Sequence, residues 1–149
     1  MSFIKSNIIT KKQRWITWIV RTLREAAWAP LMIFGLYWVG LILNLYKLFP
    51  ILDIPTHFLG GVVITYFYRA AIRNSQRLVG EIPLPIQILF GITCTGTTTI
   101  LWEFYENFAD TFLQTNMVRG LSDTIMDLFT GLLGAVVLSI FYRHRSSSS

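Results

Sequence analysis

Residues 121–142 read LSDTIMDLFTGLLGAVVLSIFY, and this stretch indicates the fold class more clearly than any other. Its charged residues are Asp123 and Asp127, and both lie in its first third. At about 1.5 Å per residue, a helix of this length crosses the ~30 Å hydrocarbon core of a bilayer. A basic run at 143–145 follows directly. The stretch therefore predicts a transmembrane helix.

Three further apolar runs precede this stretch, over about residues 29–49, 54–71 and 84–105. Hydrophobic residues make up 53% of the 149-residue chain and charged residues 14%. Soluble domains contain roughly 25% charged residues, so lipid is the more suitable solvent for this chain. The sequence predicts an all-α, polytopic membrane protein whose domain at residues 29–142 holds about four transmembrane helices.

Residues 1–28 form a basic segment ahead of the first span. Trp15, Ile19 and Leu23 recur at i, i+4 and i+8, whereas the arginines lie on another side. This pattern predicts an N-terminal amphipathic helix with its tryptophans at headgroup depth. A cleaved signal peptide is the alternative. Because the basic part is long and no A-x-A-like cleavage site follows the first apolar run, we expect the mature protein to keep the segment.

The basic residues are divided unequally between the two sides of the spans. One side holds eleven of the thirteen lysines and arginines, and the other holds Lys47 and Arg119. Since cytoplasmic loops are rich in Lys and Arg, both termini are expected on the cytoplasmic side of a bacterial-type inner membrane, including the basic, serine-rich tail at 143–149. The net charge of +5 thus indicates topology, and we expect no nucleic-acid partner.

Six of the eight acidic residues gather on the opposite side, at the outer ends of the second, third and fourth spans. These residues are Asp53, Glu103, Glu106, Asp110, Asp123 and Asp127, and His57 joins them. Within each span they are spaced at i, i+3, i+4 or i+7, so they share one helix face. The topology brings the three helix ends to one level of the membrane.

Glu103, Glu106 and Asp127 are the hardest of these acids to explain as structural residues. Fourteen residues separate Asp127 from Tyr142, which places Asp127 below the outer interface. A bare carboxylate there costs roughly 2.5–3.5 kcal/mol. The acids are therefore expected to share protons, to pair with Arg119 or His57, or to bind a metal cation.

A metal site at this position would draw on oxygen donors and one imidazole. The candidate ligands are Asp53, His57, Glu103, Glu106, Asp123 and Asp127. Such a donor set suits a divalent metal such as Mg²⁺, Mn²⁺, Ca²⁺ or iron better than a structural Zn²⁺. Helix capping is the alternative role for Asp53 and Asp123, and Asp110 can simply lie in water.

The same residues can work without a metal. Glu103, Glu106 and His57 are the candidate catalytic residues, because two carboxylates and an imidazole can act as an acid–base set. Arg119 is the candidate for binding an anionic group of a substrate. Whether the protein is an enzyme stays open at this point.

Three motifs stand in a fixed order: DIPTHFLG at residues 53–60, EFYE at 103–106 and RGLSDTIMD at 119–127. Over about residues 50–140 this order resembles VanZ-like membrane proteins and the related, uncharacterised YjdF-type inner-membrane proteins. VanZ-like chains tend to have Gln and Asn where this sequence has Glu106 and Asp127. Both differences make the site more acidic and place the chain closer to the YjdF-type branch.

The leading hypothesis is an integral membrane protein with an acidic, metal-binding site near the outer face. The site would bind, or act on, an amphiphilic envelope molecule or a lipid-linked molecule. Cation or proton transport is one alternative. A structural or assembly subunit of a membrane complex is another, in which the threonine- and glycine-rich third span would dock neighbouring helices.

Overall fold

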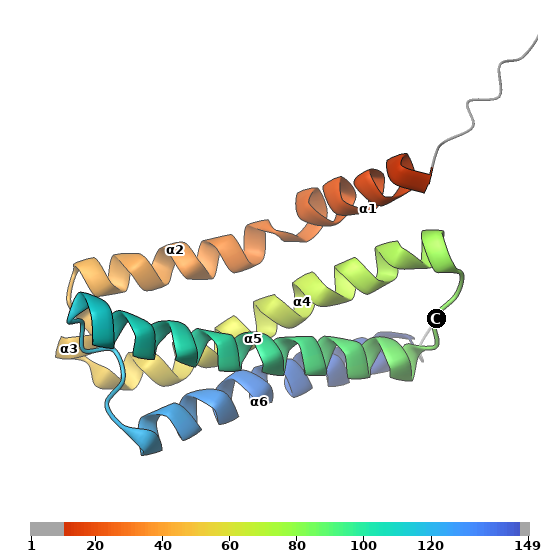
Figure 1. The fold of residues 1–149 in the computed structure, drawn as a ribbon. Helices are drawn as coiled ribbons and strands as arrows, with labels where there is room; N and C mark the ends of the chain where they lie inside the picture. Colours follow the sequence, from red (N-terminus) through yellow and green to blue (C-terminus); the bar gives the residue numbers. More distant parts are fainter. Residues whose placement is uncertain (1–10, 147–149) are drawn as a thin grey trace, which may run out of the picture.

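The structure is a computed structural model that describes residues 11–146, and every regular element in this range is helical (Figure 1). The elements are α1 (Lys11–Ala26), α2 (Trp28–Ile42), α3 (Leu45–Leu48), the 3₁₀ helix η1 (Pro50–Leu52), α4 (Asp53–Val79), α5 (Leu84–Leu113) and α6 (Leu121–Ser146). Residues 1–10 and the end of the serine tail lie outside the described part. The predicted all-α class is confirmed.

Three helices, at Pro50–Val79, Leu84–Leu113 and Leu121–Tyr142, are long and apolar enough to cross a membrane. A fourth span results if α1 and α2 count as one helix that is bent by 52° between them. At about 1.5 Å per residue, α4 and α5 exceed the ~30 Å hydrocarbon core, so their ends reach the headgroup regions. The prediction of about four spans agrees with this count.

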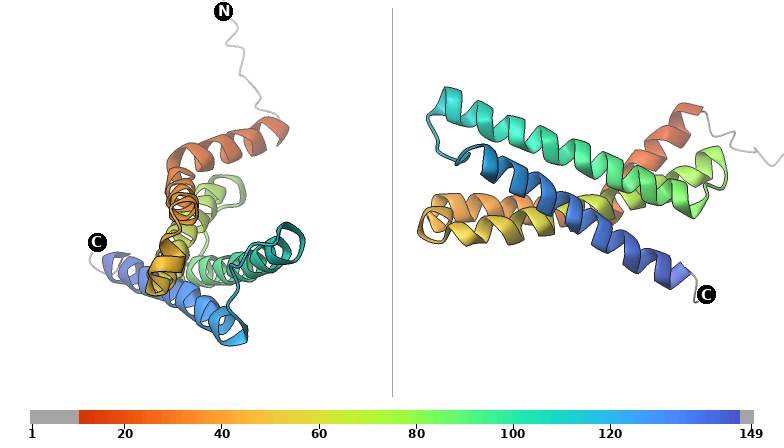
Figure 2. Two further views of the ribbon diagram at one scale, coloured as in Figure 1. Left: turned by 90° about the vertical axis from the view of Figure 1, so that its left-hand side faces the viewer. Right: turned by 90° about the horizontal axis from the view of Figure 1, so that it is seen from below.

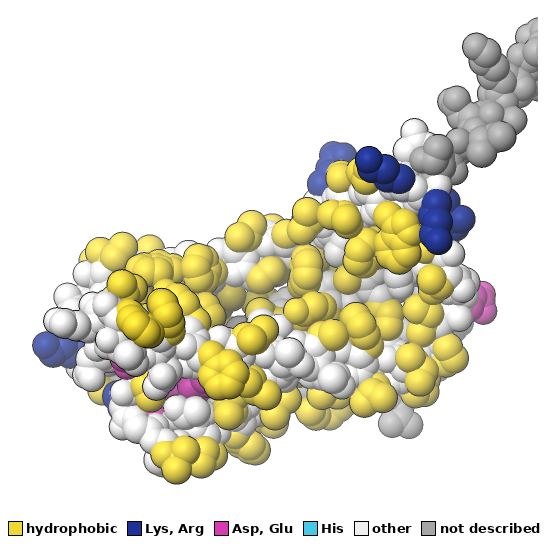
Figure 3. All heavy atoms as spheres, in the orientation of Figure 1, with side chains coloured by type: hydrophobic (Ala, Val, Ile, Leu, Met, Phe, Trp, Pro, Cys, Tyr) yellow, Lys and Arg dark blue, Asp and Glu magenta, His cyan; other side chains and the backbone are white. Residues whose placement is uncertain are grey.

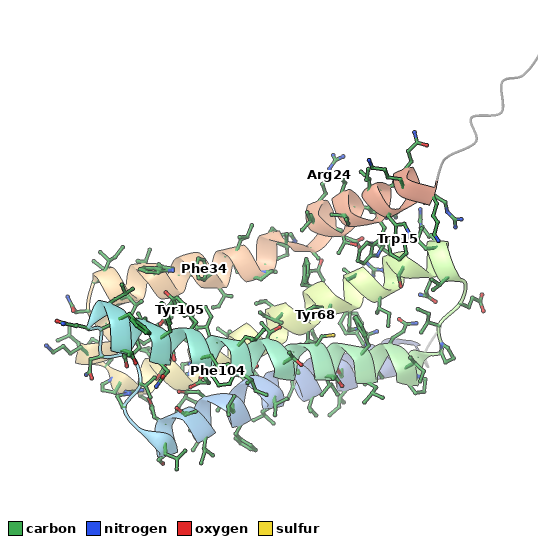
Figure 4. All side chains as sticks on the ribbon, viewed as in Figure 1. Trp15, Arg24, Phe34, Tyr68, Phe104 and Tyr105 are labelled. Carbon is green, nitrogen blue, oxygen red and sulfur yellow. The ribbon has the colours of Figure 1, made fainter. Side chains whose placement is uncertain are left out.

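Helices α4, α5 and α6 pack against one another, and α2 lies along the first half of α4 (Figures 1 and 2). Helix α1, which precedes α2 in the chain, lies against the second half of α4. One end of the bundle, which we term the acidic end, holds α3, η1 and the α5–α6 loop. The other end holds α1, the α4–α5 loop and the end of α6 (Figure 1). Lysines and arginines gather over α1 there, and Arg24 projects away from the other helices (Figures 3 and 4).

Glycines set the close approach of α4 and α6. A methyl group on Gly61 would overlap the backbone carbonyl of Gly131, with the carbonyl carbon at 2.8 Å. A methyl group on Gly134 would overlap the carbonyl oxygen of Phe58 in the same way. Apolar helices in lipid associate through van der Waals contact rather than hydrophobic burial, and small residues permit that contact. The small-residue face of the last span therefore meets α4.

The first predicted span differs from the structure. Residues 29–49 were expected to form one helix, but α2 ends at Ile42 and the chain turns at Asn44, whose φ is 55°. Asn tolerates this left-handed conformation better than most residues. The turn folds α3 back, so that the ring of Tyr46 lies against Gly40. The apolar composition continues across the turn, which is why it does not mark the break.

The second span is longer than predicted. The span was expected at about residues 54–71, yet α4 stays helical through the polar residues that follow, to Val79. Helix α1 covers this polar turn of α4. Glu25 forms an ion pair with Arg73, and the Asn74 side-chain amide donates to Glu25 at 3.0 Å. The Trp18 indole N–H donates to the carbonyl oxygen of Ala71 at 2.9 Å. These contacts dock α1 on the protein, in addition to its expected contact with the headgroups.

The third span also runs past its predicted end. Helix α5 continues to Leu113, so the expected loop of about fifteen residues shortens to residues 114–120. The left-handed Gln114 (φ 56°) ends the helix. Glu106 and Asp110 thereby stay on the helical face that starts at Glu103, and the face keeps its register up to the loop.

Candidate functional site

Glu106 accepts hydrogen bonds from side chains of two different helices. The Tyr37 hydroxyl of α2 and the Trp102 indole N–H both donate to Glu106 Oε1, each at 2.9 Å. Trp102 precedes Glu106 by four residues on α5, so helix geometry places the two side chains side by side. The Tyr37 and Trp102 rings also meet edge to face, with centroids 4.9 Å apart. Glu106 thus joins α2 to α5.

Glu103, one turn earlier on α5, shares its surroundings with Glu106 and with His57 of α4. Each of the three offers one ligand atom, and these atoms lie within 4.8 Å of one another. The exposed fractions are 7% for Glu103, 5% for Glu106 and 8% for His57. Glu103 Oε1 is fully buried and has no hydrogen-bond partner. A buried carboxyl oxygen without a partner is costly, and a cation at this point would remove the cost.

His57 also belongs to a second group of donors. His57 Nε2 lies 3.5 Å from Asp53 Oδ1 and 3.7 Å from Asp127 Oδ1. These three residues also offer ligand atoms within 4.8 Å of one another, and Asp127 of α6 is 3% exposed. His57 therefore belongs to two adjoining donor groups. We term the five residues of both groups the acidic cluster: Asp53, His57, Glu103, Glu106 and Asp127.

Arg119, in the α5–α6 loop, closes the acidic cluster on one side. Its guanidinium pairs with Asp53 and reaches Asp123 Oδ1 at 3.0 Å, and its backbone N–H donates to Asp123 Oδ2 at 3.0 Å. Burial acts to lower the pKa of Arg119, but the hydrogen bond to Asp123 and the charge of Asp53 outweigh burial and hold the pKa above its usual value. Arg119 stays charged and links the starts of α4 and α6.

Asp110 anchors the α5–α6 loop. Its Oδ1 accepts from the Thr115 hydroxyl at 2.6 Å and from the Met117 N–H at 2.8 Å, and its Oδ2 accepts from the Val118 N–H at 2.8 Å. Asp110 was expected either to belong to the polar site or simply to lie in water. The structure gives it a different role, which is to hold the loop that carries Arg119.

An Asp110→Ala variant is expected to loosen this loop. It removes the acceptor from two backbone N–H groups and one hydroxyl, and hydrogen bonds to charged groups contribute about 1.5–3 kcal/mol each where they are buried. Water can replace part of this at a loop, so we expect a loss of about 2 kcal/mol in unfolding free energy. Amide hydrogen exchange should rise at Met117 and Val118. Unchanged exchange at both amides would contradict the anchoring role.

The structure brings together most of the residues that the sequence singled out. Five of the six predicted ligands form the acidic cluster, and the sixth, Asp123, lies beside it on Arg119. Asp53 makes no capping hydrogen bond at the start of α4. Sequence reasoning missed Tyr37 and Trp102. The i, i+4 spacing of Trp102 and Glu106 was a usable signal, whereas nothing local to Tyr37 indicates its partner.

The donor set fits a hard or borderline divalent cation. Carboxylate oxygens and one imidazole from α4, α5 and α6 converge within a buried space, and carboxylates outnumber the cationic groups beside them. Such oxygen-rich sets with imidazole suit Mn²⁺, Fe²⁺ or Mg²⁺ rather than a closed Zn²⁺ site. The same groups can accept and return a proton next to a bound molecule.

The fold and the site are those of a small α-helical membrane protein with a buried acidic cluster at one end of its helix bundle. A family model described as "Predicted membrane protein (DUF2238)" matches residues 8–147, and the chain belongs to this family. The chain is also similar to an uncharacterized protein of Thermotoga maritima, with 33% identity over 110 residues. The aligned part covers 72% of this chain and 56% of that protein, so the chain matches only about half of the relative's length. No solved structure matches the chain.

Proposed function

We propose that the acidic cluster binds a divalent metal ion and that the protein uses this centre to bind or act on an amphiphilic envelope molecule or a lipid-linked molecule. The observation that carries the proposal is Glu103 Oε1, which is buried without a partner and lies in the same donor group as His57 and Glu106. Without a cation, neighbouring carboxylates repel each other and lack solvation. A bound metal ion would reduce the repulsion and replace the missing solvation.

The roles of individual residues follow from their contacts. Glu103 and Glu106 are proposed as ligands or bases, and His57 as a ligand or proton carrier. Asp127 and Asp53 face the same imidazole, so they orient it if the metal binds on the Glu side. Arg119 is proposed to meet an anionic group, through the part of its side chain that Asp53 and Asp123 leave exposed. Its ion pairs with both acids keep the Arg119 side chain in place.

The setting of the proposal is a bacterial-type inner membrane, with both termini in the cytoplasm and the acidic end at the outer face. The excess of lysine and arginine at the end that holds α1 supports this orientation. The ordered motifs at 53–60, 103–106 and 119–127 support a relationship to VanZ-like and YjdF-type proteins. They contain all five members of the acidic cluster.

Cation or proton transport is the second candidate for the same acids. A transport path needs polar groups that continue through the membrane. Residues 58–80 contain no acidic residue, and the Thr65 and Thr95 hydroxyls in that region bond to each other at 2.7 Å. Thr65 also bonds back to the carbonyl of Gly61. Because these hydroxyls are satisfied by each other and by the helix backbone, we favour a site at one end over a path through the protein.

Metal analysis tests the proposal directly. Purified protein in detergent is incubated with Mn²⁺, freed of unbound ion and analysed by mass spectrometry, beside Glu103→Gln and the matched control Glu81→Gln. Glu81 is exposed and lies at the opposite end of the bundle. We expect stoichiometric Mn²⁺ in the wild type and the control. With Mn²⁺ held near the wild-type dissociation constant, Glu103→Gln should retain several-fold less Mn²⁺, since loss of even an outer-shell partner weakens affinity at least about tenfold. Equal Mn²⁺ content in all three proteins would refute the site.

A further inference from the structure

A cavity of about 360 Å³ lies between α2, α4 and α5, next to the acidic cluster. Its walls are largely apolar and include Pro30, Phe34, Gly60, Ile64 and Trp102. Figure 3 shows the surface hollowed between α2 and the helices below it, with hydrophobic side chains on both sides. No part of the sequence analysis identified this cavity.

The cavity reaches the lipid-facing surface of the protein. Leu31 and Phe34 line it and are also exposed, at 66% and 44%. Helix α2 meets α5 at the acidic end, where the rings of Phe34 and Tyr37 contact Trp102. A molecule in the bilayer can therefore enter sideways between α2 and α5.

The cavity adjoins the acidic cluster at His57. His57 lines the cavity and belongs to both donor groups. Tyr37 and Trp102 also line it, and both donate to Glu106. The space thus has an apolar length and an end that carries the His57 imidazole, with Glu106 directly behind Tyr37 and Trp102. An amphiphile has the same division.

We infer that the cavity holds one hydrocarbon chain of a lipid-type phosphate monoester, whose phosphate lies at the acidic cluster and is held there by the metal ion. The inference rests on the metal site proposed above and adds the class of ligand. A divalent cation that is held by a few carboxylates keeps coordination positions for phosphate oxygens, as Mg²⁺ does in phosphate-binding enzymes. The carboxylates alone would repel a phosphate.

A hydrocarbon chain fits this space better than other occupants. Water is a poor occupant because apolar cavities stay dry. Lipid tails are as apolar as the cavity wall, so the chain gains little free energy by leaving the bilayer. Affinity must then come from the headgroup. The cavity selects ligands whose headgroup carries a single hydrocarbon chain.

Gly60 offers a substitution that fills the cavity without disturbing the helices. It lines the cavity, and a methyl group built on it would meet no atom within 4 Å. Gly60→Leu therefore places a side chain in the space meant for the ligand. Gly35→Leu is the matched control. Gly35 also has no atom within 4 Å of an added methyl group, and it lies on α2 outside the cavity lining.

The probe is hexadecyl phosphate that carries a photoreactive diazirine near the end of its chain, in phosphatidylcholine vesicles that contain the protein and Mn²⁺. After illumination, mass spectrometry locates the labelled residues. We expect label on cavity-lining residues such as Leu31 and Ile64. Labelling should fall about tenfold in Gly60→Leu and stay unchanged in Gly35→Leu. Unlabelled hexadecyl phosphate should compete, whereas hexadecanol should not.

The outcomes separate the cavity from the metal site. Cavity labelling that is lost in Gly60→Leu and lost on chelation of Mn²⁺ supports the inference. Label that Gly60→Leu leaves unchanged, or that is spread over the lipid-facing surface without competition, overturns it. Competition by inorganic phosphate at the same concentration as the alkyl phosphate would mean that the chain contributes nothing, and would also overturn it. Labelling that depends on Gly60 but survives chelation overturns the metal-held phosphate. Failure of Mn²⁺ to bind at all, seen separately by metal analysis, refutes the proposed function.

Discussion

Gly61→Ala is expected to destabilise the folded protein by about 3 kcal/mol or more, at the upper end of overpacking effects. The added methyl group would overlap the backbone carbonyl of Gly131 on α6. A flexible side chain could rotate away from such a contact, but a helix backbone cannot. The helices α4 and α6 would have to separate along their whole contact, which also includes the approach of Gly134 to Phe58.

The neighbouring glycine provides the control. Gly60→Ala adds the same methyl group one position earlier, where no atom lies within 4 Å. Alanine is favoured over glycine in a helix by roughly 0.5–1 kcal/mol, so this variant should be as stable as the wild type or slightly more stable. Thermal unfolding in detergent micelles and the yield of folded protein measure both. Equal midpoints for the two variants would contradict the close crossing of α4 and α6.

The spans could be predicted from the sequence because hydropathy over a membrane-length window is a local property. Their ends could not. The turn at Asn44 depends on the ring of Tyr46 packing against Gly40, and no charge or proline marks it. The helical extension of α4 to Val79 depends on α1, since Glu25 and Trp18 cover polar residues that look like a connector when read alone. Tertiary contacts decide both cases.

The acidic cluster could be predicted in part, because helical spacing is also a local property of the sequence. Helical spacing placed each pair or triplet of acids on one face, and the alternation of spans placed the three faces at one end. Which residues touch was not predictable. Arg119 pairs with Asp53 across a separation of 66 residues, and Tyr37 reaches Glu106 across 69. The cavity beside His57 depends on how far α2 stands from α5, which no sequence pattern reports. The ligand and catalytic roles of the cluster stay predictions.

Glu106→Gln is expected to reverse the order of stability between metal-free and metal-loaded protein. The glutamine carbonyl can still accept from Tyr37 and Trp102, so both hydrogen bonds remain while one negative charge leaves the acidic cluster. Neutralising a charge that is buried among like charges removes their repulsion, which we expect to stabilise the metal-free protein by about 1 kcal/mol. At pH 8 with chelator, the variant should therefore unfold at a higher temperature than the wild type.

Adding Mn²⁺ should change this order. A ligand at 100 times its dissociation constant stabilises the protein that binds it by about 2.7 kcal/mol. The wild type should gain this stabilisation, whereas Glu106→Gln lacks one ligand and should gain little. Tyr37→Phe is the matched control, because it removes one hydrogen bond to Glu106 and keeps the charge. It should be less stable than the wild type with and without Mn²⁺, and it should respond to the metal like the wild type. If Glu106→Gln is instead less stable in chelator and Mn²⁺ shifts none of the three proteins, the carboxylates serve the fold alone. The metal centre would then have to be abandoned, because a cluster kept for a cation must be strained without it.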